Sequence, residues 1–208
     1  LYPFHNSRFY VLFTKTREII ASGVLGEIVF IRTNWGGFAR RWDWQTLQSE
    51  LGGNLLNTGP HPVDQAVMLF GDDYPKVFCK MYANHHPFPG DAQNFCALIL
   101  HGEGHPTIEI MLNSFQAIPI GSDMINVSGT RGGLAGGPSG LRWRYFKPEE
   151  APVQQMWEPW SLDRQYCSES LPWIEESCEF VDDTSRVTGT GGIVRALCSK
   201  LHDVITKG

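Results

Sequence analysis

Apolar residues recur at helical spacing in three stretches of the chain, and each stretch predicts a helix. Residues 10–22 are followed by Gly23, which is a common helix stop. A second amphipathic stretch, residues 62–71, opens on a proline and closes on a glycine, as short helices often do. Residues 193–205 place their apolar side chains on one face. Helices are therefore expected near both ends of the chain and close to residue 65.

Between these helices, runs rich in β-branched and alternating apolar residues predict strands. The six candidates are residues 27–34, 76–83, 94–100, 107–115, 124–128 and 141–146. The sequence Gly102-Glu103-Gly104 predicts a hairpin turn between two of them, and residues 149–166 look irregular. Consecutive strands with short turns favour an antiparallel or mixed sheet with helices packed on one face. The expected fold is one α+β domain over residues 1–208.

Composition narrows the classes of function. The chain has 208 residues, of which 42% are hydrophobic and 19% charged, as in ordinary globular domains. A net charge of −5 argues against a nucleic-acid partner, and no apolar run reaches the roughly 20 residues that span a bilayer. Five cysteines without a C-x-x-C pair favour reduced thiols and a cytoplasmic location.

The two ends of the sequence suggest a piece of a longer protein. The chain begins with Leu1 rather than methionine and stops at Gly208, directly after a helical pattern.

Residues 51–64 are the strongest candidate for a functional site. They combine several glycines with Asn57, His61 and Asp64. His61 lies at a predicted helix N-terminus, where the helix dipole disfavours the imidazolium form. Asn57 lies on a segment that the glycines are expected to loosen. A neutral histidine beside such a backbone suits proton exchange with a small polar substrate, whereas the alternative is a helix cap with a satisfied histidine.

A second candidate is the loop that follows the first predicted strand. Trp35, Trp42 and Trp44 flank the pair Arg40 and Arg41. Indole faces stack on sugar rings, and arginine binds carboxylate or phosphate through a planar fork. Burial of the aromatic rings beneath a long loop explains the same residues equally well. The remaining tryptophans are assigned to packing: Trp143, Trp157, Trp160 and Trp173.

Other motifs are weaker. The glycine-rich residues 129–133 and 189–192 lack the lysine and hydroxyl of a P-loop and the spacing of a dinucleotide fingerprint. His101 and His105 flank a glycine turn instead of sharing a helical face, and the adjacent His85 and His86 would point to opposite sides of a strand. We expect no metal site, and no signature of a catalytic serine or cysteine is present.

The string from Gly52 to Gly71 resembles the second domain of the Gfo/Idh/MocA oxidoreductases (glucose-fructose oxidoreductase, inositol dehydrogenase and rhizopine catabolism). That family carries glycines, an aspartate, a further glycine, and then a histidine and an aspartate three residues apart. Residues 6–9, 25–28 and 125–132 look like other parts of the same domain, in the right order. The resemblance runs from about residue 5 to the end and is poor across residues 149–187.

The resemblance implies a two-domain enzyme. An N-terminal Rossmann domain would bind NAD or NADP and supply a catalytic lysine from a Glu-Lys-Pro motif. An α+β domain with a large open sheet would contact the substrate and mediate formation of a homo-oligomer. Because this chain contains neither the fingerprint nor Glu-Lys-Pro, it resembles the substrate domain without its cofactor-binding half.

The match also assigns roles to residues. His61 takes the position of the family's catalytic histidine, which exchanges a proton with the substrate while hydride moves to or from the nicotinamide. Asn57 stands where aspartate is usual, and an amide can orient a substrate but cannot accept a proton. Asp64 would support the helix start or orient His61. Together with Arg41, Trp42 and Trp44, it completes the predicted substrate side.

The expected activity is NAD(P)-dependent oxidation or reduction of a sugar, polyol or related hydroxyl compound. Two alternatives stay open from the sequence. One is a non-catalytic module for carbohydrate binding or dimerisation, which would suit Asn57. The other is an offshoot of the family that cleaves glycosides through transient oxidation by tightly held NAD.

Overall fold

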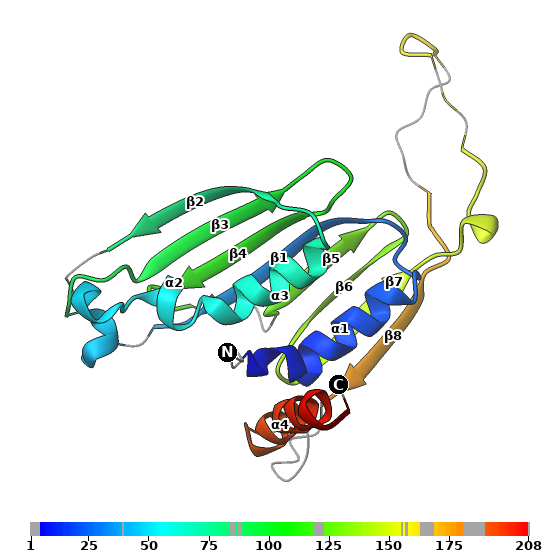
Figure 1. Ribbon diagram of the computed structural model, residues 1–208. Coiled ribbons are helices and arrows are strands. Elements are labelled where there is room, and N and C mark those ends of the chain that lie inside the picture. Colours follow the sequence, from blue (N-terminus) through cyan, green and yellow to red (C-terminus); the bar gives the residue numbers. More distant parts are fainter. Residues whose placement is uncertain are drawn as a thin grey trace.

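An open eight-stranded sheet with helices on one face forms the body of the chain (Figure 1). The computed structural model describes residues 5–38, 40–83, 86, 89–118, 123–154, 156, 158–162, 169–180 and 190–207. The strands are β1 (Ile28–Gly36), β2 (Lys76–Tyr82), β3 (Phe95–His101), β4 (Thr107–Asn113), β5 (Ile125–Gly129), β6 (Gly132–Gly137), β7 (Gly140–Tyr145) and β8 (Ile174–Glu179). This is the α+β class that the sequence predicts.

The strand order is β2-β3-β4-β1-β5-β6-β7-β8, so that β1 lies inside the sheet. It pairs in parallel with β4 and antiparallel with β5, and every other neighbouring pair of named strands is antiparallel. The turn at Gly102–Gly104 joins β3 to β4, as expected for a hairpin.

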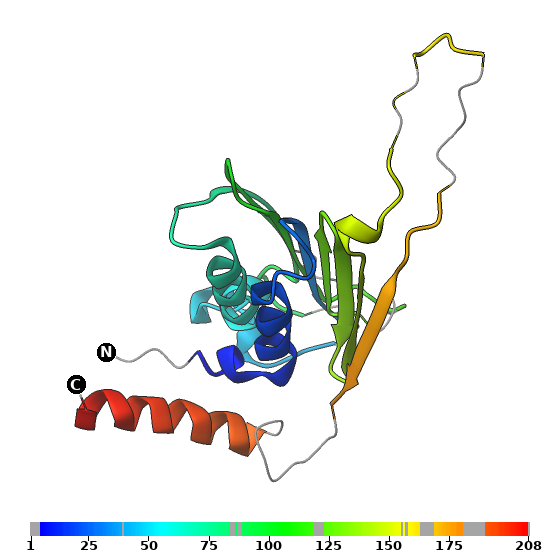
Figure 2. The same cartoon turned by 90° about the vertical axis from the view of Figure 1, so that its right-hand side faces the viewer.

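Helices flank this sheet. They are α1 (Val11–Ala21), α2 (Asn54–Asn57), α3 (Pro60–Phe70) and α4 (Thr190–Lys207), with short 3-10 helices η1 (Asn6–Phe9), η2 (Trp44–Thr46), η3 (Gln48–Glu50) and η4 (Pro148–Glu150). Figures 1 and 2 show α1, α2 and α3 on the same face, whereas α4 lies beside η1. Within the described ranges, no helix is long and apolar enough to cross a bilayer.

The core lies between the sheet and α1 and α3. Alternate residues of the inner strands point inward and are buried, as a strand period of two requires. The fully buried side chains of this layer include Leu25, Ile31, Cys96, Ile108, Ile110, Leu112 and Val127. Trp143 packs against the same core, as predicted. Trp160 is instead exposed, and Trp157 lies outside the described residues.

Two strands were missed by the sequence pattern. β6 reads Gly-Gly-Leu-Ala-Gly-Gly and contains one large side chain, Leu134, which points into the core. β8 reads Ile-Glu-Glu-Ser-Cys-Glu, and its polar composition reflects its position at the edge of the sheet. Both pair along their full length with β7, so cross-strand hydrogen bonding overrides their weak strand propensity.

His105 stabilises the C-terminal end of α3. Its Nδ1 lies 2.9 Å from the carbonyl oxygen of Phe70 at the end of α3, and its Nε2 lies 2.9 Å from a carboxylate oxygen of Asp73. The imidazole also stacks on the Phe70 ring at 4.4 Å between centroids. The histidine therefore caps α3, since last-turn carbonyls need an external donor.

Candidate active site

The glycines around residues 52–59 are packed tightly against neighbouring backbone. A Cβ on Gly52 would lie 2.3 Å from the carbonyl oxygen of Gln45, and one on Gly53 would meet the side chain of Gln93 at 2.2 Å. The amide of Gly53 also donates to Gln45 O at 2.8 Å. Our expectation that these glycines loosen the segment was wrong. They are buried, and they allow close approach of the loop that carries Arg41.

Gly59 makes the break between α2 and α3. Its amide donates to the carbonyl oxygen of Asn54 at 2.7 Å, five residues back, and the amide of His61 then donates to Thr58 O at 3.2 Å. A Cβ on Gly59 would lie 2.3 Å from Leu55 O. α3 therefore begins at Pro60, two residues earlier than predicted, and His61 occupies the second position of the helix.

His61 stacks on Trp35, which projects from the end of β1. The two ring centroids are 6.2 Å apart at an interplanar angle of 24°, and the other neighbour of Trp35 is Tyr10, at 6.5 Å and 16°. The indole N–H donates to Thr33 Oγ1 at 3.0 Å, which fixes the ring. We call this arrangement of Tyr10, Trp35 and His61 the aromatic stack. It holds the imidazole in a defined orientation at the start of α3.

The imidazole of His61 is half-buried and incompletely hydrogen-bonded. Among the described residues, its Nδ1 is buried and has no hydrogen-bond partner. Burial lowers the pKa of His61 below its ordinary value of 6.5, the nearby His5 lowers it further, and Asp64 acts in the opposite direction. The ring is thus favoured in its neutral form, as expected at a helix N-terminus. A buried ring nitrogen without a partner is unusual and suits contact with a ligand.

Asp64 is held by a neighbouring cation. Arg8 Nε donates to one carboxylate oxygen at 2.7 Å, and Arg8 Nη2 donates to the other at 2.5 Å. The Asp64 side chain is only 12% exposed. This bidentate pair joins η1 to α3, so Asp64 positions the helix that carries His61 and acts on the imidazole through its charge. The geometry favours this role over direct substrate contact.

Arg41 and Asn57 lie together in a polar pocket of about 160 Å³. The pocket lies between the loop after β1, the α2 segment and the start of β3. It is lined by Arg41, Gln45, Thr46, Gly53, Asn54, Asn57, Thr58, Pro89, Ala92, Gln93, Asn94 and Ser114. The guanidinium of Arg41 is oriented by Asp43, whose Oδ2 accepts from Nε at 2.9 Å. His61 follows Asn57 by four residues and is not among the lining residues.

Asn54 fastens this pocket to the sheet and was not singled out from the sequence. Its Nδ2 donates to Asn94 O at 2.8 Å and to Ser114 Oγ at 3.0 Å. Its position directly after Gly53 was the available signal. We assign it a positioning role for Asn57, three residues later on α2.

The three tryptophans of the predicted loop separate in the structure. Trp35 belongs to β1 and to the aromatic stack, whereas Trp42 is 85% exposed and Trp44 lies exposed on η2. Neither Trp42 nor Trp44 lines the polar pocket. Alternation along β1, in which Ile31 and Thr33 point inward, would have placed Trp35 on the helix side of the sheet.

Trp35 also borders an apolar cavity of about 290 Å³. The cavity lies between α1, β1, the start of β5 and α4, and it is lined by Tyr10, Val11, Leu12, Phe13, Thr33, Trp35, Gln65, Met124, Ile125, Pro138 and Ile193. One indole ring thus separates this cavity from the imidazole of His61.

Across the described part of the chain, no cluster of three or more His, Cys, Asp or Glu side chains could hold a metal ion. His85 and Gly189 lie outside the described residues.

Comparison with known protein families shows to which family this chain belongs. The family model described as the GFO/IDH/MocA C-terminal domain matches residues 13–135, which is more than half of the chain. The chain belongs to the GFO/IDH/MocA family. The matched region contains β1, the polar pocket and His61, so the candidate active site falls within the part that defines membership.

GFO/IDH/MocA relatives are oxidoreductases by name. Two uncharacterized oxidoreductases of Schizosaccharomyces pombe are each 29% identical over 62% of this chain and 36% of their own length. The chain therefore spans about a third of the curated relatives that it matches.

Solved structures of oxidoreductases have a fold similar to that of this chain. An oxidoreductase from Bacillus cereus has a TM-score of 0.68 and 17% identity over 99% of this chain and 56% of its own. An oxidoreductase from Agrobacterium radiobacter, in complex with NAD+, L-tartaric acid and magnesium, has a TM-score of 0.55 and 17% identity over 70% of this chain and 43% of its own. These likenesses concern the fold alone.

Proposed function

We propose that this chain is the substrate domain of a two-domain NAD(P)-dependent oxidoreductase that acts on a hydroxyl group of a sugar, polyol or related compound. The observation that carries the proposal is the imidazole of His61: neutral, fixed on Trp35, and with a buried nitrogen that lacks a partner among the described residues. A catalytic base needs this combination of orientation and lowered pKa.

The residues of the site fit the substrate end of such a reaction. The polar pocket offers the amide group of Asn57 and the guanidinium of Arg41, which suit hydroxyl-rich compounds. The glycine-rich turn at residues 129–132 packs against the backbone that precedes β1, since a Cβ on Gly129 would clash with the carbonyl oxygen of Leu25. We therefore assign the binding of NAD or NADP mainly to a Rossmann domain in the complete protein.

Residues of this chain would then bind the substrate and exchange its proton. In the oxidation direction His61 would take the proton of the substrate hydroxyl, while Asn57 and Arg41 would orient the remaining hydroxyl groups. Asp64 and Arg8 would keep α3 in place. The bound nicotinamide would supply the hydride acceptor.

The test is a cofactor assay on the complete two-domain protein. NAD and NADP are each offered with a panel of aldoses, polyols, inositols and sugar acids, and formation of the reduced cofactor is followed. We expect reduction with at least one member of the panel. Binding of sugars without any reduction would contradict the proposal and favour a pure binding module. Release of an aglycone from glycosides without net reduction would favour the glycosidase-like alternative.

We further propose that the protein is a homo-oligomer assembled through its sheet, and that it works in the cytoplasm. Support for assembly comes from the sheet face opposite the helices, where Phe30, Phe78 and Met111 occupy outward positions of three strands. Support for the compartment comes from the four cysteines of the described ranges, which are all free thiols.

A further inference from the structure

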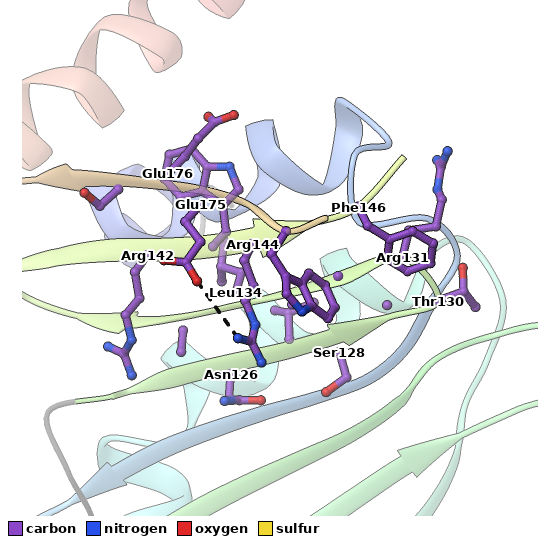
Figure 3. A pocket seen from close by; sticks show the side chains of 18 residues that line it. Asn126, Ser128, Thr130, Arg131, Leu134, Arg142, Arg144, Phe146, Glu175 and Glu176 are labelled. Carbon is purple, nitrogen blue, oxygen red and sulfur yellow. Dashed lines mark ion pairs between the residues drawn. The ribbon is translucent and has the colours of Figure 1, made fainter. Parts of the chain in front are cut away.

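Outside the candidate active site, a hollow of about 760 Å³ lies on the outer face of the sheet, over β5, β6, β7 and β8 (Figure 3). Two arginines of β7 line it, and each is already paired. Arg142 binds Asp123 at 2.6 and 2.8 Å, and Arg144 lies 4.0 Å from Glu175. These arginines therefore offer no free positive charge to a ligand. The opposite face of the sheet, at the β2 edge, carries side chains with chemistry of their own.

Two cysteines on neighbouring strands are in contact at this edge. Cys79 lies in the middle of β2 and Cys96 near the start of β3, and their sulfur atoms are 3.7 Å apart. In the antiparallel register Cys79 pairs with Leu98, whereas Cys96 pairs with Met81. The two thiols are thus diagonal neighbours on one face of the sheet. Because Leu98 is buried in the core, this is the face that the helices cover.

The two thiols differ in their access to solvent. Cys96 is fully buried in the core, whereas Cys79 is exposed, as is every residue of β2. β2 is the terminal strand of the sheet, and the helices do not extend over it (Figure 1). Because Cys79 points to the helix side, assembly through the outer face would not cover its thiol. A dissolved oxidant can therefore reach Cys79 directly, but not Cys96.

The surroundings of Cys96 protect its thiol from direct oxidation. Burial, followed by the contact with Cys79, raises the pKa of the Cys96 thiol to about 12. The thiolate is the form that attacks an oxidant, and a thiol with a raised pKa stays protonated near neutral pH. The contact between the two sulfur atoms nevertheless places Cys96 where it can react with Cys79 once that residue is oxidised.

A bond between the two sulfur atoms needs only a small movement of the edge strand. A disulfide has an S–S distance of about 2.05 Å, so the sulfur atoms, now 3.7 Å apart, must approach by about 1.7 Å. Diagonal positions are farther apart than most disulfide partners, so β2 must shift toward β3 as the Cys79 side chain rotates. In the described sheet β2 has a neighbour on one side only and no buried residue, so this shift disturbs few contacts.

We propose that Cys79 and Cys96 are a redox-sensitive pair that hydrogen peroxide converts to a disulfide between β2 and β3. In the first step the Cys79 sulfur attacks one peroxide oxygen, the O–O bond breaks, and Cys79 sulfenic acid and water form. In the second step the Cys96 sulfur attacks the Cys79 sulfur, the S–O bond breaks, and the hydroxide leaves with the Cys96 proton as water. Two thiols are oxidised and one peroxide is reduced, and cellular thiols would reverse the change by exchange.

The experiment maps the cysteines of the complete protein after brief treatment with hydrogen peroxide. Remaining thiols are blocked with N-ethylmaleimide in denaturant, and the protein is digested without reduction for mass spectrometry. We expect a linked pair of peptides that contain residues 79 and 96, which dithiothreitol separates. Recovery of Cys96 as its maleimide adduct would overturn the proposal, whether Cys79 is then unmodified, a sulfinic acid or joined to another cysteine. The readout does not depend on oxidoreductase activity.

An internal control and two variants test the order of the steps. Cys198 is also exposed but lies on α4, and it should join neither cysteine of the pair. In Cys79→Ser, which changes only an exposed position, Cys96 should stay reduced under the same treatment. In Cys96→Ala, Cys79 should remain a sulfenic acid that dimedone traps. Oxidation of Cys96 without Cys79, or the absence of a dimedone adduct on Cys79 in the folded second variant, would contradict the proposed sequence.

Discussion

Replacing His61 by alanine in the complete protein is expected to lower kcat for hydroxyl oxidation by about 100- to 10,000-fold, which is the usual contribution of a positioned acid–base residue. The affinity for NAD or NADP should change little, because the imidazole acts on the substrate proton. We expect this loss because Trp35 holds the imidazole of His61 in place, and no other histidine among the described residues stacks on Trp35. Steady-state kinetics together with cofactor titration measure both quantities.

His202→Ala is the matched control. His202 lies exposed on α4, and its Nδ1 lies 3.9 Å from a carboxylate oxygen of the neighbouring Asp203. Its removal should leave kcat within about a factor of two, as is usual for an exposed surface residue. If His61→Ala retained full kcat, the imidazole would be a structural cap, and the non-catalytic alternative would gain support.

Replacing Gly59 by alanine is expected to destabilise the start of α3 by about 1–3 kcal/mol, the usual cost of overpacking. The added Cβ would lie 2.3 Å from Leu55 O, so the turn between α2 and α3 must open. Native-state hydrogen exchange should show protection of the α3 amides falling by about 10- to 100-fold. kcat should fall as well, because His61 is two residues away.

Gly37→Ala provides the comparison for this variant. A Cβ at Gly37 meets nothing within 4 Å, so protection of the α3 amides and kcat should both remain unchanged. Equal effects at the two positions would mean that the packing of Gly59 does not determine the position of His61.

Local pattern predicted most of the fold. Helices α1 and α3 were anticipated to within two residues because their apolar spacing and stop signals lie in a single segment. β6 and β8 could not be found this way. Their stability comes from pairing with β7 along their full length.

The site was predictable only in part. His61, Asn57 and Arg41 were identified from residue type and resemblance, and the structure places the last two in one pocket. The contacts that orient them join residues far apart in the sequence. Arg8 reaches Asp64 across 56 positions, and the aromatic stack joins three elements. The glycines were misinterpreted because close packing and flexibility favour the same residue.

The pH dependence of kcat/KM for oxidation tests most directly whether His61 is the group that exchanges the substrate proton. Burial and His5 lower the pKa of His61, whereas Asp64 raises it. The base must be neutral, so the rate should fall with decreasing pH at an apparent pKa below 6.5. His5→Ala should move this limb to higher pH, and Asp64→Asn should move it to lower pH. A limb that both variants leave in place would contradict the assignment.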